Sequence, residues 1–259
     1  MDPYYEEVGR YYDEDARDFL RRYEGNYVLQ TLREDFRRQT LRHLRDRPKR
    51  ILEIGFGPGL DMEFFASVFP DAEIWGVEVS RAMIDVARSR LGEDRFVYLH
   101  GSVEELDIRE KFDLVYSYFG AFNTVKDLRR LSEALLRVSH RNTLLVFSCV
   151  NKPYLFDMLF YLLTLRPKRA FARLGRWGGY SPSKFLDSRP LSYSDILRSM
   201  EGWRVEYFRG YSILYPAWYR HHRYPPALSR ILWRIDGVLN LTPLKYVGEY
   251  ALYVMRPEA

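Results

Sequence analysis

The chain has 259 residues, a length that fits one α/β domain with insertions better than several independent domains. Its single cysteine, Cys149, excludes a disulfide framework or a thiolate metal site within one chain, and we expect a buried structural thiol. The net charge of +5 is unevenly distributed, because residues 1–149 carry 23 basic and 27 acidic side chains whereas residues 150–259 carry 17 and 8.

The N-terminal segment is charged and tyrosine-rich. Because Met1-Asp2-Pro3 leads into charged residues instead of an apolar stretch, we predict no secretory signal and expect a cytoplasmic protein. Residues 26–46 place apolar side chains at helical spacing and predict a helix that ends before Pro48. We expect residues 1–48 to form a helical cover on the domain.

A strand and a glycine-rich turn follow. Residues 51–54 read Ile-Leu-Glu-Ile and predict a buried parallel strand, with a helix near 60–69 after the turn. Glu53 would repel a pyrophosphate, and Pro58 lacks the backbone donor that a phosphate would need. The dinucleotide fingerprint spaces its glycines as G-x-G-x-x-G, whereas this turn has G-x-G-x-G at Gly55, Gly57 and Gly59. We therefore expect a cationic adenosine derivative.

Further strand and helix patterns alternate along the chain. The strand at 74–79 contains Glu78, at the position where such folds bind ribose hydroxyls, so Glu78 is the predicted ribose ligand. Repeating βα units predict a mostly parallel sheet with helices on both faces. The remaining expected elements are a helix capped by Ser80, strands at 96–99, 112–118 and within 144–150, a short acidic helix or turn after the third strand, and a helix at about 125–139 with a capping-box-like start at Thr124-x-x-Asp127.

Two insertions interrupt the C-terminal part, at residues 151–190 and 211–247. A helix near 192–200 and strands near 203–209 and 248–255 complete the pattern, and the insertions are expected to form a lid. Residues 154–165 are largely apolar but too few to span a bilayer. We expect this segment to be the roof of an apolar pocket or, less favoured, a helix that docks on an anionic membrane. The basic residues that flank it are Lys152, Arg166, Lys168, Arg169, Arg173 and Arg176.

The strand, the glycine turn and Glu78 together resemble the class I S-adenosylmethionine-dependent methyltransferases, particularly the small-molecule, type 11-like branch. The resemblance is good over residues 5 to about 150 and covers the rest in outline. It implies a Rossmann-like fold with a seven-stranded, mostly parallel sheet in the order 3-2-1-4-5-7-6. It also implies one domain over residues 1–259, a cofactor-binding core at 49–150, S-adenosylmethionine as methyl donor, S-adenosylhomocysteine as product, and no metal.

The resemblance also assigns binding roles. The glycine loop would pass under the methionine part of the cofactor, and a loop after the third strand would recognise adenine. The family usually has Gly-Asp where this chain has Gly101-Ser102, so Ser102, the Val103 amide or Glu104 would take that role. The segment from Tyr5 to Asp13 resembles a family pattern that closes over the cofactor, although an amphipathic surface helix end is an equal alternative. The expected cofactor-binding residues are Tyr12, Glu53, Gly55, Phe56, Gly57, Gly59, Glu78, Val79, Ser102, Val103, Glu104 and Ser117.

Candidate residues for the acceptor side follow the fourth strand and occur in the second insertion. Tyr118 and Asn123 are expected to meet the acceptor, with loop packing as the equal alternative. If the acceptor is a hydroxyl, His221 and His222 are candidate general bases because imidazole titrates near neutral pH; exposed lid positions are the favoured alternative for both. The histidines show no metal-binding spacing.

These patterns predict a methyltransferase that acts on a small apolar or aromatic acceptor by in-line displacement. An RNA methyltransferase is a first alternative, because Tyr211 to Trp233 interleaves aromatic and basic residues. The fourth strand is followed by Ser117-Tyr118-Phe119-Gly120 instead of an Asn-Pro-Pro-Tyr-like motif, which makes nucleic acid the less favoured partner. A noncatalytic protein that binds S-adenosylmethionine is the second alternative, and peripheral membrane contact stays open.

Overall fold

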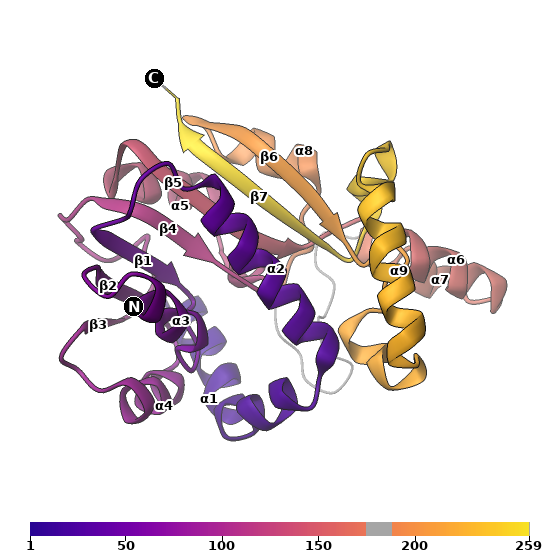
Figure 1. The fold of residues 1–259 in the computed structure, drawn as a ribbon, viewed down its shortest axis with the longest axis horizontal. Helices are drawn as coiled ribbons and strands as arrows, with labels where there is room; N and C mark the ends of the chain where they lie inside the picture. Colours follow the sequence, from indigo (N-terminus) through magenta and orange to yellow (C-terminus); the bar gives the residue numbers. More distant parts are fainter. Residues whose placement is uncertain (175–187, 259) are drawn as a thin grey trace.

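A seven-stranded sheet in the order β3-β2-β1-β4-β5-β7-β6 forms the centre of the protein, as predicted (Figure 1). The computed structural model describes residues 1–174 and 188–258. Strands β1 to β5 run parallel, and β7 lies antiparallel between β5 and β6. The strands are β1 Arg50–Ile54, β2 Glu73–Glu78, β3 Phe96–His100, β4 Phe112–Ser117, β5 Ser139–Val150, β6 Trp203–Tyr211 and β7 Tyr250–Pro257.

Apolar side chains cover both faces of this sheet. Successive residues of a strand point to opposite faces, so Ile51 and Leu114 join one buried cluster while Leu52 and Val115 join the other. Cys149 is fully buried in the second cluster, as predicted, and its burial raises the pKa of the thiol. The first cluster includes side chains of α2 (Tyr27–His43), α3 (Leu60–Val68) and α4 (Arg81–Leu91), and the second includes those of α5 (Leu128–Arg137) and α8 (Tyr193–Ser199).

The strand order reverses between β1 and β4, whose carboxyl ends reach the same edge of the sheet. In open α/β sheets ligands bind beyond the strand ends at such a reversal. The long N-terminal helix α1 (Pro3–Glu24) lies near this edge and packs on α4 (Figure 1). The fold therefore places a cover, a sheet edge and the glycine turn around one region.

One predicted helix start is wrong. Helix α5 begins at Leu128, and the Asp127 side chain accepts hydrogen bonds from the amides of Arg129 and Arg130. Thr124 instead ends a short 3-10 helix, η1 (Ala121–Thr124), and its hydroxyl donates to the carbonyl of Ala121. Because the chain leaves β4 through η1, Thr124 belongs to that 3-10 helix and does not cap α5. Asp127 alone caps α5.

The insertions form short helices at one end of the molecule (Figure 1). Arg176 and the rest of 175–187 lie outside the described residues. Across the two described ranges, no helix combines the length and apolarity that crossing a membrane requires. The insertions contribute α6 (Leu155–Leu163), α7 (Pro167–Ala170), η2 (Ala172–Leu174), η3 (Trp218–Arg223), α9 (Pro226–Leu239) and η4 (Pro243–Val247).

Candidate active site

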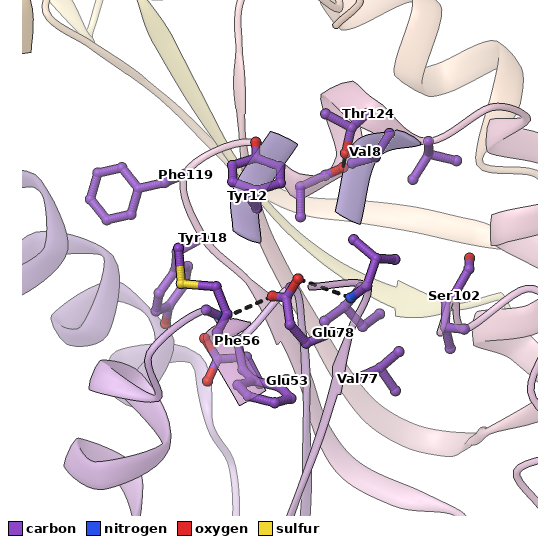
Figure 2. Close-up of a pocket in the computed structure, with 18 of the residues that line it drawn as sticks. Val8, Tyr12, Glu53, Phe56, Val77, Glu78, Ser102, Tyr118, Phe119 and Thr124 are labelled. Carbon is purple, nitrogen blue, oxygen red and sulfur yellow. Dashed lines mark hydrogen bonds between the residues drawn. The ribbon is translucent and has the colours of Figure 1, made fainter. Parts of the chain in front are cut away.

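A pocket opens at the carboxyl ends of β1, β2 and β4, where the strand order reverses (Figure 2). Glu78 faces this pocket, with Tyr12 and Val8 of α1 on one side of it and Glu53 on the other. The structure brings together most of the residues predicted to bind the cofactor. Those in the wall are Tyr12, Glu53, Gly55, Phe56, Gly57, Glu78, Val79, Ser102, Val103 and Glu104.

The glycine turn exposes backbone to the pocket. Gly55, Gly57 and Gly59 all have positive φ angles, of 69°, 53° and 77°, which other L-residues rarely adopt. A Cβ atom on Gly57 would meet no protein atom within 4 Å, so this glycine leaves open space where a ligand can approach the chain. Gly59 precedes α3 and is not part of the wall.

Glu78 links the glycine turn to the second strand. Its Oε2 accepts a hydrogen bond from the Gly57 amide at 2.9 Å, and its Oε1 accepts from Val79 at 2.9 Å and Ser80 at 3.0 Å. Burial raises the pKa of this carboxyl, and the three amides act in the opposite direction. A carboxylate offers about four acceptor positions, so one position is left for a ribose hydroxyl.

Glu53 is buried at the base of the pocket, with 2% of its surface exposed. The Tyr116 hydroxyl donates to its Oε2 at 2.8 Å. Burial, followed by the negative charge of Asp61, raises the pKa of Glu53 well above its ordinary value. Glu53 was expected to carry a negative charge, whereas its surroundings favour the neutral acid.

A buried cluster of two arginines and one aspartate borders the same pocket. The Arg37 Nε donates to Asp61 at 2.7 Å, and an Arg33 amino group donates to the other oxygen of that carboxylate. The Arg33 guanidinium also lies 4.8 Å from the centre of the Tyr23 ring and 4.7 Å from that of Phe119. One carboxylate shared by two guanidinium groups leaves a net positive charge beside the pocket.

The predicted adenine side is tied to the N-terminal helix. The hydroxyls of Tyr5 and Ser102 both donate to Oε2 of Glu104, Ser102 at 2.8 Å. The Lys126 amide donates to the Tyr5 hydroxyl at 3.2 Å. Burial raises the pKa of Glu104, and the two hydroxyls act in the opposite direction. Glu104 thus occupies the loop where the family usually has an aspartate, and it also holds the start of α1.

Helix α1 lies across the pocket as a cover. Gly9 permits this close approach, because a Cβ atom there would lie 2.5 Å from the carbonyl oxygen of Val79. Asp13 accepts hydrogen bonds from the Ser80 hydroxyl at 2.7 Å and the Ala82 amide at 3.0 Å. This arrangement favours the covering interpretation of the opening segment, and contact between Tyr12 and the cofactor stays a prediction.

The residues proposed for the acceptor side are not gathered in the pocket. The ring of Tyr118 lines it, but its hydroxyl bonds to Thr40 of α2 at 2.5 Å. Asn123 and Ser117 are buried outside the wall, and the Asn123 amide bonds to the backbone of Val150. His221 and His222 lie in η3 and contribute to neither of the two pockets described here.

Sequence reasoning also missed several wall residues. Arg33 and Asp61 come from α2 and α3, and their proximity depends on helix packing that no local pattern records. Tyr5, Val8 and Phe19 of α1 were detectable, because they share helical spacing with Tyr12. The other wall residues that the sequence did not indicate are Ile54, Val77, Met83, Gly101, Ala121, Thr124, Val125 and Leu131.

Comparisons with known proteins indicate a methyltransferase domain. Residues 51–142 match the family model described as a methyltransferase domain. Among curated relatives, a malonyl-[acyl-carrier protein] O-methyltransferase from Anoxybacillus flavithermus is 27% identical over 164 residues, which are 62% of this chain and 61% of the relative. The match therefore spans less than two thirds of that relative's length.

Two solved structures share the fold over almost the whole chain. The geranyl diphosphate C-methyltransferase of Streptomyces coelicolor A3(2) superposes with a TM-score of 0.65 at 14% identity, covering 100% of this chain and 99% of that one. The [4+2]-cyclase SpnF also has a TM-score of 0.65, at 18% identity, covering 98% and 97%. Residues 51–142 thus match a methyltransferase-domain model, and the sheet order and the pocket at the strand ends are similar to those of the class I S-adenosylmethionine-dependent methyltransferases. As SpnF illustrates, the fold alone does not define the reaction.

Proposed function

We propose that the protein transfers the methyl group of S-adenosylmethionine to a small acceptor that has an aromatic or apolar body and a carboxylate. When bound, the cofactor supplies an electrophilic methyl group on a sulfonium sulfur. Glu78, the glycine turn and Glu53 would hold its ribose and methionine parts. The proposal depends chiefly on a second pocket that adjoins the cofactor pocket and shares Tyr12, Phe19, Arg33 and Phe119 with it.

The second pocket suits an aromatic or apolar body. Phe119, at the junction, has a φ of 58°, an uncommon conformation for a residue other than glycine that recurs at functional sites. Orientation of two reactants at about 3 to 3.5 Å can account for ~7 to 11 kcal/mol of a barrier when water is excluded. The aromatic residues of this pocket would exclude that water. They are Tyr11, Tyr12, Phe19, Tyr23, Phe119, Trp218 and Tyr250.

The charge at the junction supports an anionic acceptor. Arg33 is buried and borders both pockets, and its Nε has no hydrogen-bond partner. Its charge is only half offset, because Asp61 is shared with Arg37. A buried guanidinium with a free donor suits a carboxylate. The Anoxybacillus relative is named for O-methylation of a malonyl group, which has a free carboxylate.

A carboxylate acceptor would not require a general base. Its oxygen is already deprotonated at neutral pH, whereas a hydroxyl must lose a proton during transfer. His221 and His222 lie outside both pocket linings, so neither wall supplies an imidazole to a hydroxyl acceptor. Alignment of the two reactants is then the main contribution of the protein.

The RNA alternative loses part of its support. It depended on free basic residues in the C-terminal region, and several of these form ion pairs. Arg220 pairs with Asp157 at 2.7 Å, and Arg256 pairs with Glu206 at 2.9 Å. A phosphate backbone would have to displace these partners.

The test uses radiolabelled S-adenosylmethionine and a panel of aromatic and aliphatic carboxylic acids with their matched amides, together with malonyl-acyl-carrier protein. We expect product from acids only, and base treatment should release the label as methanol, because methyl esters hydrolyse whereas N- and C-methyl groups do not. Arg33→Lys should lower kcat/KM by about 10- to 100-fold, from the loss of one bidentate contact, with S-adenosylhomocysteine affinity within a few-fold. Arg42→Lys, on the exposed side of α2, is the matched control.

Two outcomes would contradict the proposal. A base-stable methyl product would show that the acceptor is not a carboxylate. Binding of S-adenosylhomocysteine without transfer to any member of the panel, or to extracted metabolites and RNA, would favour the noncatalytic alternative.

A further inference from the structure

Helices α6 and α7 form a hairpin that extends beyond α9 at one end of the molecule (Figure 1). No residue of α6 is buried, and neither of the two pockets has a lining residue from α6 or α7. The described residues of this hairpin therefore do not form the predicted roof. Their apolar side chains need another explanation.

The tip of the hairpin exposes leucines. Leu162, Leu163 and Leu165 have exposed fractions of 42%, 84% and 88%. Burial of a leucine side chain stabilises a fold, so several adjacent exposed leucines form an apolar patch that folding leaves in contact with water. Such a patch on a convex tip indicates a binding surface.

The backbone at the tip points to the same conclusion. Helix α6 ends in a Schellman motif, in which the Arg166 amide donates to the Tyr161 carbonyl at 2.7 Å and the Leu165 amide donates to the Leu162 carbonyl at 3.0 Å. The residue that turns the chain there, Leu165, has a φ of 57°, a position usually taken by glycine. A leucine at this position adds strain and contributes no buried contact.

Positive charge surrounds these leucines. Residues 158–174 contain no acidic side chain. Arg166, Lys168 and Arg169 are exposed beside the tip, while Arg173 turns inward and lies 3.5 Å from Glu249. The tip thus combines apolar side chains with three solvent-facing cations.

We propose that the α6–α7 tip docks on the surface of an anionic lipid bilayer. The leucines enter the boundary between headgroups and acyl chains, and the three cations face lipid phosphates. A fluid surface accommodates a convex apolar tip, whereas a protein partner must supply a matching groove. A second copy of this chain is a poor partner, because a two-fold contact would bring like charges together.

The topology relates this surface to the cofactor site. Strand β5 runs parallel to β4 and β1, and α6 follows its carboxyl end. The hairpin therefore leaves the sheet at the edge where the cofactor pocket opens. Docking would bring that edge to the membrane, where apolar molecules concentrate. The docking proposal does not depend on the identity of the acceptor.

Vesicle flotation tests the proposal with the full chain. The probes are vesicles of phosphatidylcholine alone and vesicles with about 30% phosphatidylglycerol, at about 0.1 M and about 0.5 M salt. We expect binding only to the anionic vesicles and weaker binding at high salt. Replacing two cations, as in Lys168→Gln with Arg169→Gln, should weaken binding about 30-fold at ~1 kcal/mol per cation.

Leu165→Gly separates docking from folding. Glycine suits the backbone at this position, so the variant should unfold at the same or a higher temperature while binding vesicles at least about 10-fold more weakly. Arg137→Gln with Arg141→Gln removes two exposed cations near the opposite edge of the sheet and should bind as the wild type does.

Three results would overturn the proposal. The wild type could fail to float with anionic vesicles, or the tip variants could bind as strongly as the wild type. Binding that is lost only after Ile231→Ser with Val238→Ser would move the membrane contact to the exposed apolar stripe of α9.

Discussion

Replacing Glu53 with glutamine tests whether a buried carboxylate selects the cationic end of the cofactor. The Tyr116 hydroxyl keeps an acceptor in the variant, so shape and hydrogen bonding change little. An ammonium group at about 4 Å attracts a carboxylate by ~4 kcal/mol at an effective dielectric of about 20. Part of that attraction is spent on ionising an acid whose pKa burial and Asp61 raise. We therefore expect Glu53→Gln to weaken S-adenosylhomocysteine binding about 10- to 100-fold.

The pH dependence of binding provides the sharper measurement. At pH values where Glu53 of the free protein is protonated, binding of a cationic ligand must release this proton. The affinity for S-adenosylhomocysteine should therefore rise by up to about tenfold per pH unit and become constant above the raised pKa of Glu53. Calorimetry between about pH 5.5 and about 8, in buffers of different ionisation enthalpy, reports the proton directly. Glu63→Gln, on the exposed side of α3, should behave as the wild type. A flat profile with unchanged affinity in Glu53→Gln would refute the reasoning.

The same substitution has an opposite effect on the free protein. The folded-state pKa of Glu53 lies above its unfolded value of 4.5, so the folded state binds more protons between the two values. The free energy of unfolding therefore falls as pH rises through that window, and this loss persists above it. Without ligand, Glu53→Gln should be the more stable protein at neutral pH in urea titrations.

Two further predictions concern residues outside the cofactor contacts. Asn123→Ala removes the side chain that bonds to the buried amide and carbonyl of Val150, so it should lower the free energy of unfolding by about 3 kcal/mol. The affinity for S-adenosylhomocysteine, measured by calorimetry, should change less than about threefold. A large loss of affinity would show that Asn123 belongs to the binding site. Burial raises the pKa of Asp236 from 3.8 to about 6, so the folded state binds more protons than the unfolded state between these values. As pH rises from about 4 to about 6, the free energy of unfolding of the wild type should therefore fall by up to about 3 kcal/mol relative to that of Asp236→Asn. Urea titrations of both proteins measure this difference. A constant difference between the two proteins would contradict the burial argument.

Local patterns predicted most of the strands, the glycine turn and Glu78 for a physical reason, whereas the strand order and the adenine loop came from the family resemblance. A buried parallel strand must be apolar, and a chain that turns tightly beneath a ligand needs glycine. The amino-acid types at residues 51–59 therefore predict a strand followed by a tight turn. Glu78 follows the same logic, because its position at the end of β2 places it at the sheet edge. Such features depend on neighbours in sequence.

Other features depend on neighbours in space and could not be predicted this way. The raised pKa of Glu53 comes first from burial and then from the charge of Asp61, which reaches it from a separate helix. Thr124 and Asp127 matched a capping box, but the chain first had to leave β4 through η1. For α6 the composition indicated an apolar helix without indicating which surroundings it faces, since all of its residues except Asp157 are apolar or aromatic.

The charges at the two ends of the site suggest how binding and release are balanced. Glu53 lies at the base of the cofactor pocket, and Arg33, whose partner Asp61 is shared with Arg37, lies at the junction with the second pocket. Each group favours a ligand of opposite charge, so a cationic donor and an anionic acceptor stabilise each other and their own protein partners. Methyl transfer from a sulfonium to a carboxylate neutralises both reacting centres. In the proposed reaction Arg33 would then lose its anion, and the aromatic wall of the second pocket would hold the ester. A site with this charge arrangement binds its reactants more strongly than its products.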